Sequence, residues 1–183
     1  MSRQNTSRFA ILGILTWDAM SGYDIKKWVE SSISNFWSES YGQIYPILKG
    51  LVADGWAAVT VEPQAGKPNR HVYAITEAGQ AALREWLALP IEHQTGRSEL
   101  LLKLFFGTRA PTAENIRHVQ QFRDRQVELL RKYDDIEHWL DKTMRDEPGA
   151  DYWQITLRYG QHSARALLAW CDETLERLAK RKA

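Results

Sequence analysis

Two long helical patterns in the second half of the chain constrain its fold more than any other feature. Over residues 112–144, apolar side chains return at alternating spacings of three and four, with Gln126 as the polar exception. Residues 150–181 carry a similar stripe, in which Gly160 and Ala164 are small enough for another helix to approach closely. At 1.5 Å per residue each predicted helix is about 45 to 50 Å long. Helices of this length outreach a small neighbouring domain and need a further packing partner.

The composition is that of a globular, soluble protein with no bulk charge that favours polyanions. Apolar residues make up 44% and charged residues 26%, and 24 Lys and Arg against 23 Asp and Glu give a net charge of +1. The apolar run 9–15 is too short to span a membrane and is expected to be a buried helix, not a signal peptide. The single cysteine, Cys171, fits a cytoplasmic chain without disulfides and is expected to be a small core residue.

The first half of the chain has a different texture, and we place a domain boundary near Pro90. Periodic apolar positions and β-rich runs predict three short helices, a two-stranded hairpin and a fourth helix, in that order. The expected elements cover about residues 6–17, 21–33, 41–54, 57–62, 70–76 and 77–90. The fold class is therefore mainly α with a small β-hairpin wing, in a mixed domain over residues 1–90 and a helical domain over residues 91–183.

The third predicted helix has a buried face and a thin polar face. Its apolar stripe consists of Ile44, Ile47, Leu48 and Leu51. The opposite face carries small or polar residues, namely Gly42, Pro46, Lys49 and Ala53, flanked by Gln43 and Tyr45. If the helix starts at Gly42 or Gln43, Pro46 falls among the first four amides, which have no intrahelical partner. A helix with so thin a face fits the DNA major groove, which is about 12 Å wide.

The order of three helices followed by a hairpin is that of a winged helix-turn-helix, with the third helix as the reader. Gln43 is suited to an adenine edge and Lys49 to guanine or to a phosphate. Hydroxyl groups next to them, and basic groups on the wing, are suited to phosphates. The candidate DNA-binding residues are Ser40, Tyr41, Gln43, Tyr45, Lys49, Lys67 and Arg70. The alternative is that Tyr41 and Tyr45 are packing groups and that Lys67 and Arg70 are ordinary turn residues.

Three segments of the first half resemble the PadR family of bacterial transcriptional regulators, in the same order and spacing. They are ILGILTWDAMSGYDIKKW, YGQIYPILKGLVADGW and GKPNRHVYAITEAGQAALREWL. From about Arg97 the chain resembles, more weakly, the long helical region of the larger subgroup of this family, through SELLLKLFF. The resemblance implies a winged-helix DNA-binding domain, a helical dimerisation region, and repression that a small aromatic or hydrophobic effector relieves.

The resemblance also assigns roles to individual residues. It places the recognition helix on about Tyr41 to Asp54. The DNA-facing positions are Gln43, Tyr45 and Lys49, and the wing positions are Lys67, Pro68 and Arg70. The chain departs from the family pattern at Gly50, Leu51, Val52 and Asn69, where basic groups are fewer. Fewer phosphate contacts are the expected consequence.

The apolar stripe of the long helices can be covered in either of two ways. The helices can pack on each other as an intramolecular hairpin, or on those of a second copy. We favour the second copy, because paired half-sites on double-stranded DNA also call for a homodimer. The residues then expected to be buried between the copies are Phe122, Leu129, Ile136, Leu157 and Leu167.

The same helices carry an unusual aromatic load, which indicates a pocket for a small aromatic effector between the winged domain and the dimer helices. Planar rings offer stacking surface, and His162 or Tyr159 can orient a phenol or carboxylate. The candidate effector-binding residues are Tyr133, Trp139, Trp153, Tyr159, His162 and Trp170. The alternative is that these rings only fill the core.

Nothing in the sequence points to an enzyme, a metal or a cofactor. Histidines occur at 71, 93, 118, 138 and 162, and no spacing among them puts two ligands on one helix face. Cys171 and His162 lie nine positions apart on one predicted helix, too far apart to pair directly. The competing function is a helical dimeric adaptor that uses its winged domain to bind a protein without reading DNA.

Overall fold

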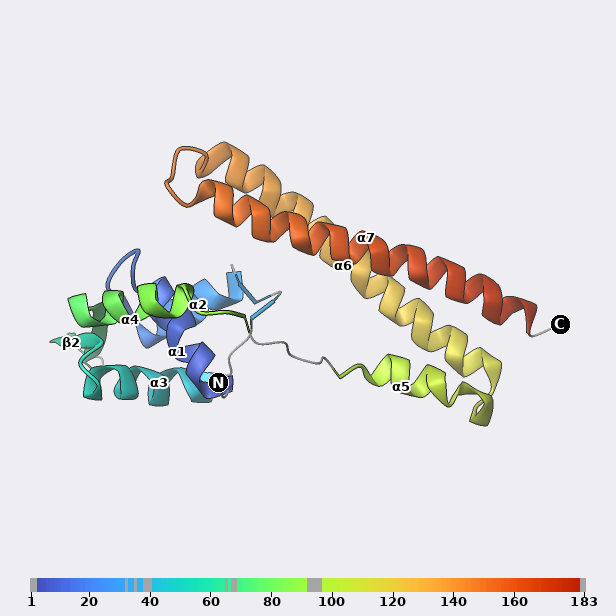
Figure 1. Cartoon of the computed structure of the whole chain (residues 1–183), viewed down its shortest axis with the longest axis horizontal. Coiled ribbons are helices and arrows are strands. Elements are labelled where there is room, and N and C mark those ends of the chain that lie inside the picture. Colours follow the sequence, from blue (N-terminus) through green and yellow to red (C-terminus); the bar gives the residue numbers. More distant parts are fainter. Residues whose placement is uncertain are drawn as a thin grey trace. The chain divides into compact units, whose positions relative to one another are not determined.

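The computed structural model describes residues 3–31, 33–34, 36–37, 41–64, 66, 69–91 and 97–181, and the chain divides into two compact units after Gln94 (Figure 1). The first unit contains α1 (Arg3–Ile14), β1 (Met20–Ser21), α2 (Gly22–Ser31), α3 (Tyr41–Ala53), β2 (Ala57–Glu62), β3 (Arg70–Ile75) and α4 (Glu77–Leu87). The second contains α5 (Glu99–Phe105), the 3₁₀ turn η1 (Gly107–Arg109), α6 (Thr112–Thr143) and α7 (Ala150–Lys180). The mainly α class with a small sheet is confirmed.

Helix α1 forms the centre of the first unit. Its apolar run, predicted to be a buried helix, supplies five buried side chains: Phe9, Ile11, Leu12, Ile14 and Leu15. They pack with the apolar stripe of α3 and with Ile25 of α2. Phe9 also stacks on Trp86 of α4, with ring centroids 4.8 Å apart. The core thus joins four helices through one central element.

The wing is a three-stranded antiparallel sheet in the order β1-β3-β2, not the two-stranded hairpin that we predicted. Strand β3 pairs with β2 over six residue pairs, from Ala57↔Ile75 to Glu62↔Arg70. On its other edge it pairs with β1, where Ser21 lies opposite Val72. Strand β1 has only two residues, too few to carry a β periodicity, so the sequence pattern missed it.

The start of helix α4 is bonded to the segment that follows α3. The Thr76 hydroxyl accepts a hydrogen bond from the Gly79 amide at 3.1 Å and donates one to the Gly55 carbonyl at 2.7 Å. A Cβ on Gly79 would lie 2.1 Å from the Trp56 carbonyl oxygen. Only glycine therefore fits here. The helix ends at Leu87, three residues before the predicted end at Pro90.

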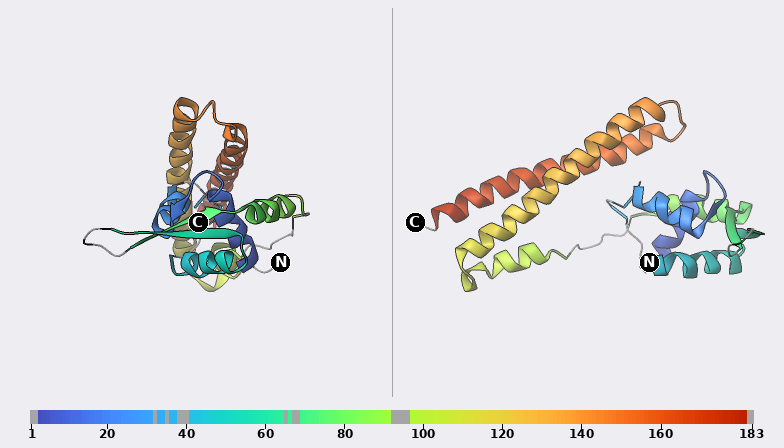
Figure 2. Two further views of the ribbon diagram at one scale, coloured as in Figure 1. Left: turned by 90° about the vertical axis from the view of Figure 1, so that its left-hand side faces the viewer. Right: turned by 180° about the vertical axis from the view of Figure 1, so that it is seen from behind.

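The second unit is built on a hairpin of α6 and α7, which run side by side (Figure 2). Both helices match the predicted bounds to within one residue. Their shared core contains Tyr133, Leu140, Leu157 and Ala164. As the small residue predicted, Gly160 admits a close neighbour: a Cβ there would lie 2.5 Å from Cζ of Tyr133. None of the helices that the structure describes is long and apolar enough to cross a membrane.

The α6–α7 hairpin itself covers most of the residues that were predicted to lie between two copies. Leu157 is buried between α6 and α7, and Leu129 and Ile136 pack against the same core. Phe122 meets Trp170 edge to face, with ring centroids 6.2 Å apart. Leu167 is exposed. Most of the stripe is therefore covered within the chain, which is the alternative that we disfavoured, because the short α6–α7 connection allows the two helices to pack on each other.

We predict that Gly79→Ala lowers the free energy of unfolding by about 2 to 3 kcal/mol, because the new methyl group meets a backbone carbonyl that cannot turn away. Urea unfolding measures the change. The control is Gly13→Ala in α1, where a Cβ meets nothing within 4 Å. That variant is expected to be neutral or to gain about 0.5 kcal/mol. Equal effects from the two substitutions would contradict the close contact at Gly79.

Candidate nucleic-acid interface

The two faces of α3 separate as predicted. Ile44, Ile47, Leu48 and Leu51 are buried in the core of the first unit. Among the residues of the opposite face, Gly42, Gln43, Pro46, Lys49 and Ala53 are exposed. The Gln43 amide and the Lys49 ammonium form no hydrogen bond or ion pair with another described residue and remain available for a ligand. The exposed side of α3 is thus narrow, with two polar groups separated by small residues.

Tyr45 has a packing role as well as an exposed edge. A Cβ on Gly22 would lie 2.8 Å from Cε1 of Tyr45, so the ring covers the first residue of α2. This contact favours the packing alternative for Tyr45, while about a third of the residue stays open to solvent. Of the other candidates, the side chain of Tyr41 and all of Ser40, Lys67 and Pro68 lie outside the described residues.

Pro46 lies inside α3, not among its first four amides, because the helix begins at Tyr41. A proline here removes the donor that would reach the carbonyl of Gly42, four residues earlier. Gly42 is exposed, so water can satisfy that carbonyl. The predicted position of Pro46 among the first four amides was therefore wrong, and solvent exposure keeps the cost of the lost hydrogen bond small.

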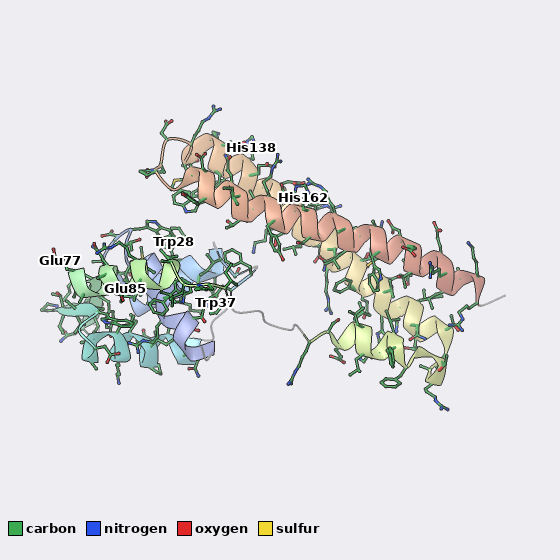
Figure 3. The ribbon with its side chains drawn as sticks, viewed as in Figure 1. Trp28, Trp37, Glu77, Glu85, His138 and His162 are labelled. Atoms are coloured by element: carbon green, nitrogen blue, oxygen red, sulfur yellow. The ribbon has the colours of Figure 1, made fainter. Side chains whose placement is uncertain are left out.

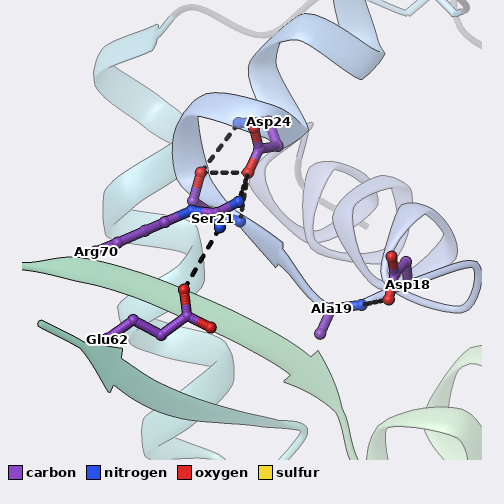
Figure 4. A network of polar contacts seen from close by, with 6 residues as sticks. All are labelled: Asp18, Ala19, Ser21, Asp24, Glu62 and Arg70. Atoms are coloured by element: carbon purple, nitrogen blue, oxygen red, sulfur yellow. Dashed lines mark hydrogen bonds and ion pairs between the residues drawn. The ribbon is translucent and has the colours of Figure 1, made fainter. Parts of the chain in front are cut away.

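Arg70 of β3 belongs to a polar network that the sequence did not reveal (Figure 4). Its Nη2 donates to Asp24 Oδ2 at 2.7 Å, and its Nη1 lies 3.4 Å from Glu62 Oε2. Asp24 is held in turn by Ser21, whose hydroxyl donates to Oδ2 at 2.6 Å and whose amide donates to it at 3.1 Å. The Ser21 hydroxyl also accepts from the Asp24 amide at 3.3 Å.

These bonds make Ser21 and Asp24 a reciprocal cap at the start of α2. Ser21 is thus the N-cap of α2. Asp24 was missed, although its spacing of three from Ser21 is the signal of a capping box. The hydrogen bond from Ser21, and then that from Arg70, hold the pKa of Asp24 below its usual range. Asp24 raises the pKa of Arg70 in return, so the pair is fully ionised at neutral pH.

The six predicted effector residues do not converge within the second unit. Tyr133 is buried against Gly160, and burial raises its pKa. Trp153 packs over Gly149, and Trp170 packs on Phe122. Trp153 and Trp170 lie 17 positions apart on α7, about 25 Å along the helix. The side chains of Trp139, Tyr159 and His162 are exposed. His162 is seen on α7 in Figure 3.

The remaining titratable groups form no reactive cluster in the part of the chain that the structure describes. No group of three or more His, Cys, Asp or Glu side chains there is placed to hold a metal ion. Cys171 is buried, as expected of a small core residue, and burial raises the pKa of its thiol. His138 and His162 lie on different helices of the hairpin (Figure 3).

Two family descriptions match the chain and together cover most of its length. Residues 11–85 match the transcriptional regulator PadR-like family. Residues 96–179 match the family described as virulence activator alpha C-term. The first match begins in the last turn of α1 and ends near the end of α4, and the second spans α5 to α7.

Three individual relatives agree with these matches. The probable transcriptional regulator Rv1176c of Mycobacterium tuberculosis is 29% identical over 94% of this chain and 97% of the relative. The negative transcriptional regulator PadR of Bacillus subtilis is 36% identical over 54% of this chain and 55% of its own. The crystal structure of smu.1604c from Streptococcus mutans has a TM-score of 0.79 and 30% identity, and covers 92% of this chain and 98% of that chain.

Bacillus subtilis PadR has also been solved in two complexes that share this fold. The structure with operator DNA has a TM-score of 0.81 at 23% identity, and covers 94% of this chain and 99% of that chain. The structure with p-coumaric acid has a TM-score of 0.74 at 22% identity, and covers 98% of both chains.

We predict that Asp24→Asn lowers the free energy of unfolding at pH 7 and that the difference from the parent shrinks below about pH 4. The pKa of Asp24 is lower in the folded than in the unfolded chain, so its ionised form stabilises the fold above the unfolded pKa. That contribution is lost as the pH falls through the folded pKa. Urea unfolding between pH 7 and pH 2.5 measures it.

The matched control is Glu85→Gln on α4 (Figure 3), an exposed carboxylate with no ion pair to another described residue. Its difference from the parent should stay near zero at every pH. A difference for Asp24→Asn that is the same at pH 7 and pH 2.5 would show that the carboxylate charge contributes nothing.

Proposed function

The chain belongs to the PadR-like family of transcriptional regulators, and from this premise we propose that it is a cytoplasmic, homodimeric repressor that binds operator DNA. Members of this family are regulators of transcription and not enzymes. In this proposal α3 enters the major groove, the sheet of β1 to β3 flanks it, and the helices of the second unit hold two copies together.

The observation that carries the proposal is the exposed face of α3. A reading helix must bring polar groups to base edges without bulky neighbours that hold the backbone away. Gln43 and Lys49 meet this need, because the residues beside them are Gly42, Pro46 and Ala53. The buried stripe on the other side of α3 supplies a rigid base, which base readout requires.

Relatives support the repressor and DNA parts of the proposal. The Bacillus subtilis relative is named a negative regulator, and its structure with operator DNA has the same fold as this chain. The match at 36% identity falls within about half of each chain. We therefore propose operator binding and repression for this chain.

The homodimer is supported by apolar side chains that the second unit leaves exposed. Helix α5 has no buried residue, and Leu101, Leu102, Phe105 and Phe106 each expose more than half of their surface. Four large apolar side chains exposed within residues 101–106 are typical of an interaction surface. We propose that α5 contributes to the dimer interface, since α6 and α7 largely cover each other.

The effector is supported by the Bacillus subtilis structure with p-coumaric acid. Among the six predicted residues of this chain, Trp139, Tyr159 and His162 keep exposed surface that a flat aromatic acid can contact. An effector relieves repression only if it binds one arrangement of the two reading helices more tightly than the other.

Base reading by Gln43 is tested on a panel of operator variants. Gln43→Ala is expected to change base preference at one position, with a loss of about 1 to 3 kcal/mol for the preferred base. Lys67→Ala is expected to weaken binding to all sequences about equally and to lower the slope of log K against log salt by about 0.9. Fluorescence anisotropy with labelled duplexes measures both. Indistinguishable effects of the two substitutions would overturn the assigned roles.

The dimer is tested by light scattering on the full chain. Phe105→Ser is expected to raise the monomer fraction at micromolar concentration, because it removes a large apolar side chain that is 82% exposed in the single chain. The control is Leu87→Ser in the first unit, which is 67% exposed and should leave the dimer intact. A parent chain that is monomeric at micromolar concentration would overturn the proposal.

The effector is tested by tryptophan fluorescence during titration with p-coumaric acid. Saturable quenching in the parent should shrink in Trp139→Phe, because this ring is half exposed, and should be accompanied by release of DNA. Trp153→Phe and Trp170→Phe serve as controls, since those rings are packed within the hairpin. Quenching that Trp139→Phe leaves unchanged would exclude this ring from the effector site.

A further inference from the structure

Arg70 is the first residue of β3, the central strand of the wing sheet, and its guanidinium contacts a carboxylate on strand β2 and another on helix α2. Glu62, its carboxylate partner on one side, is also its register partner at the end of β2. Asp24, its partner on the other side, lies in the first turn of α2, directly after β1. One guanidinium thus connects the wing to the helix-turn-helix from a position 46 residues along the chain from Asp24.

We propose that Arg70 is a positioning residue for DNA binding, which fixes the wing against the start of α2 and does not neutralise a phosphate. The proposal replaces the phosphate contact that the sequence predicted for Arg70, and it rests on the proposed DNA-binding function.

The geometry of the guanidinium is the first argument. Arginine presents its donors in a flat, rigid fork that suits two oxygen acceptors at once. Here Nη2 is bonded to Asp24 and Nη1 faces Glu62. A phosphate that took Nη2 would have to displace the Asp24 carboxylate, which would then lie beside the phosphate as a like charge.

The charge count is the second argument. One arginine faces two carboxylates, so the group as a whole is negative and does not attract a phosphate. Asp24 is also not free to turn away, because Ser21 holds the same carboxylate oxygen with two hydrogen bonds. The Ser21 backbone is at the same time a β1 residue paired with Val72 of β3. The cap of α2, the pairing of β1 with β3 and the ion pair of Arg70 therefore all involve Ser21 or Asp24.

The consequence for DNA is a fixed relation between the wing and α3. Tyr45 of α3 packs on Gly22, the residue between Ser21 and the rest of α2. A shift of β3 away from Asp24 would thus loosen the start of α2, against which Tyr45 of the reading helix packs. Loss of the network should weaken DNA binding without changing the number of phosphates that are neutralised.

The test is the affinity of the full chain for its operator duplex, measured by fluorescence anisotropy between 50 and 200 mM salt. The variants are Arg70→Gln, Arg70→Lys and Asp24→Asn. The matched control is Arg84→Gln on α4, which removes one exposed positive charge and no ion pair with another described residue. Thermal unfolding establishes that each variant is folded at the assay temperature.

We expect Arg70→Gln and Asp24→Asn each to weaken binding about fivefold relative to the control, at an unchanged slope of log K against log salt. The double variant should be no weaker than the worse single variant. Arg70→Lys should restore little of the loss, because a compact ammonium on a flexible stem lacks the rigid fork that holds both carboxylates in a fixed position. Glu62→Gln leaves the helix cap intact and should weaken binding about twofold, which keeps the test valid if Asp24→Asn unfolds.

A phosphate contact gives the opposite results and would overturn the proposal. In that case Arg70→Gln lowers the salt slope by about 0.9, Arg70→Lys retains the affinity, and Asp24→Asn binds DNA more tightly. A parent that shows no preference for operator DNA refutes the proposed function instead. Hydrogen exchange then decides the wing contact by itself: the amides of Val72 and Tyr73 should exchange about fivefold faster in Arg70→Gln than in Arg84→Gln. Equal exchange would overturn it.

Discussion

Burial of one side of α3 against α1 determines which side of that helix the protein can offer to a ligand. Ile44, Leu48 and Leu51 are almost completely buried, so rotation of α3 about its axis would expose several large apolar side chains to water. The exposed side is consequently fixed, and its small residues keep it thin. The proposed reading of DNA by Gln43 and Lys49 depends on this single packing constraint.

Close contacts at glycines and one polar network set the rest of the first unit around α3. Gly22 receives the ring of Tyr45, and Gly79 lets α4 start against the Trp56 carbonyl. The Ser21, Asp24 and Arg70 network connects β1, α2 and β3 at one point (Figure 4). Each contact joins segments that are far apart in the sequence, and together they give the reading helix and the wing a defined geometry within the unit.

Local patterns in the sequence were sufficient for the helices and insufficient for the contacts between distant segments. The bounds of α6 and α7 were predicted to within one residue, because a spacing of three and four over some thirty positions is unambiguous. The same spacing does not say which helix covers the stripe, and in the single chain α6 and α7 bury Leu157 between themselves. The pairing of β1 with β3 and the ion pair of Arg70 with Asp24 each join residues about 50 positions apart, so no local pattern predicts them.

DNA reading by the first unit can be measured as a preference of the full chain for one DNA sequence. The association constant for duplex DNA from just upstream of the gene's own start is measured between 50 and 200 mM salt, against a duplex of the same length and scrambled sequence. Sequence-specific DNA reading predicts a preference of at least about a thousandfold for the upstream duplex, and a log K that falls linearly with log salt. Equal affinity for both duplexes, or an affinity that salt does not change, would contradict it and favour a protein-binding adaptor.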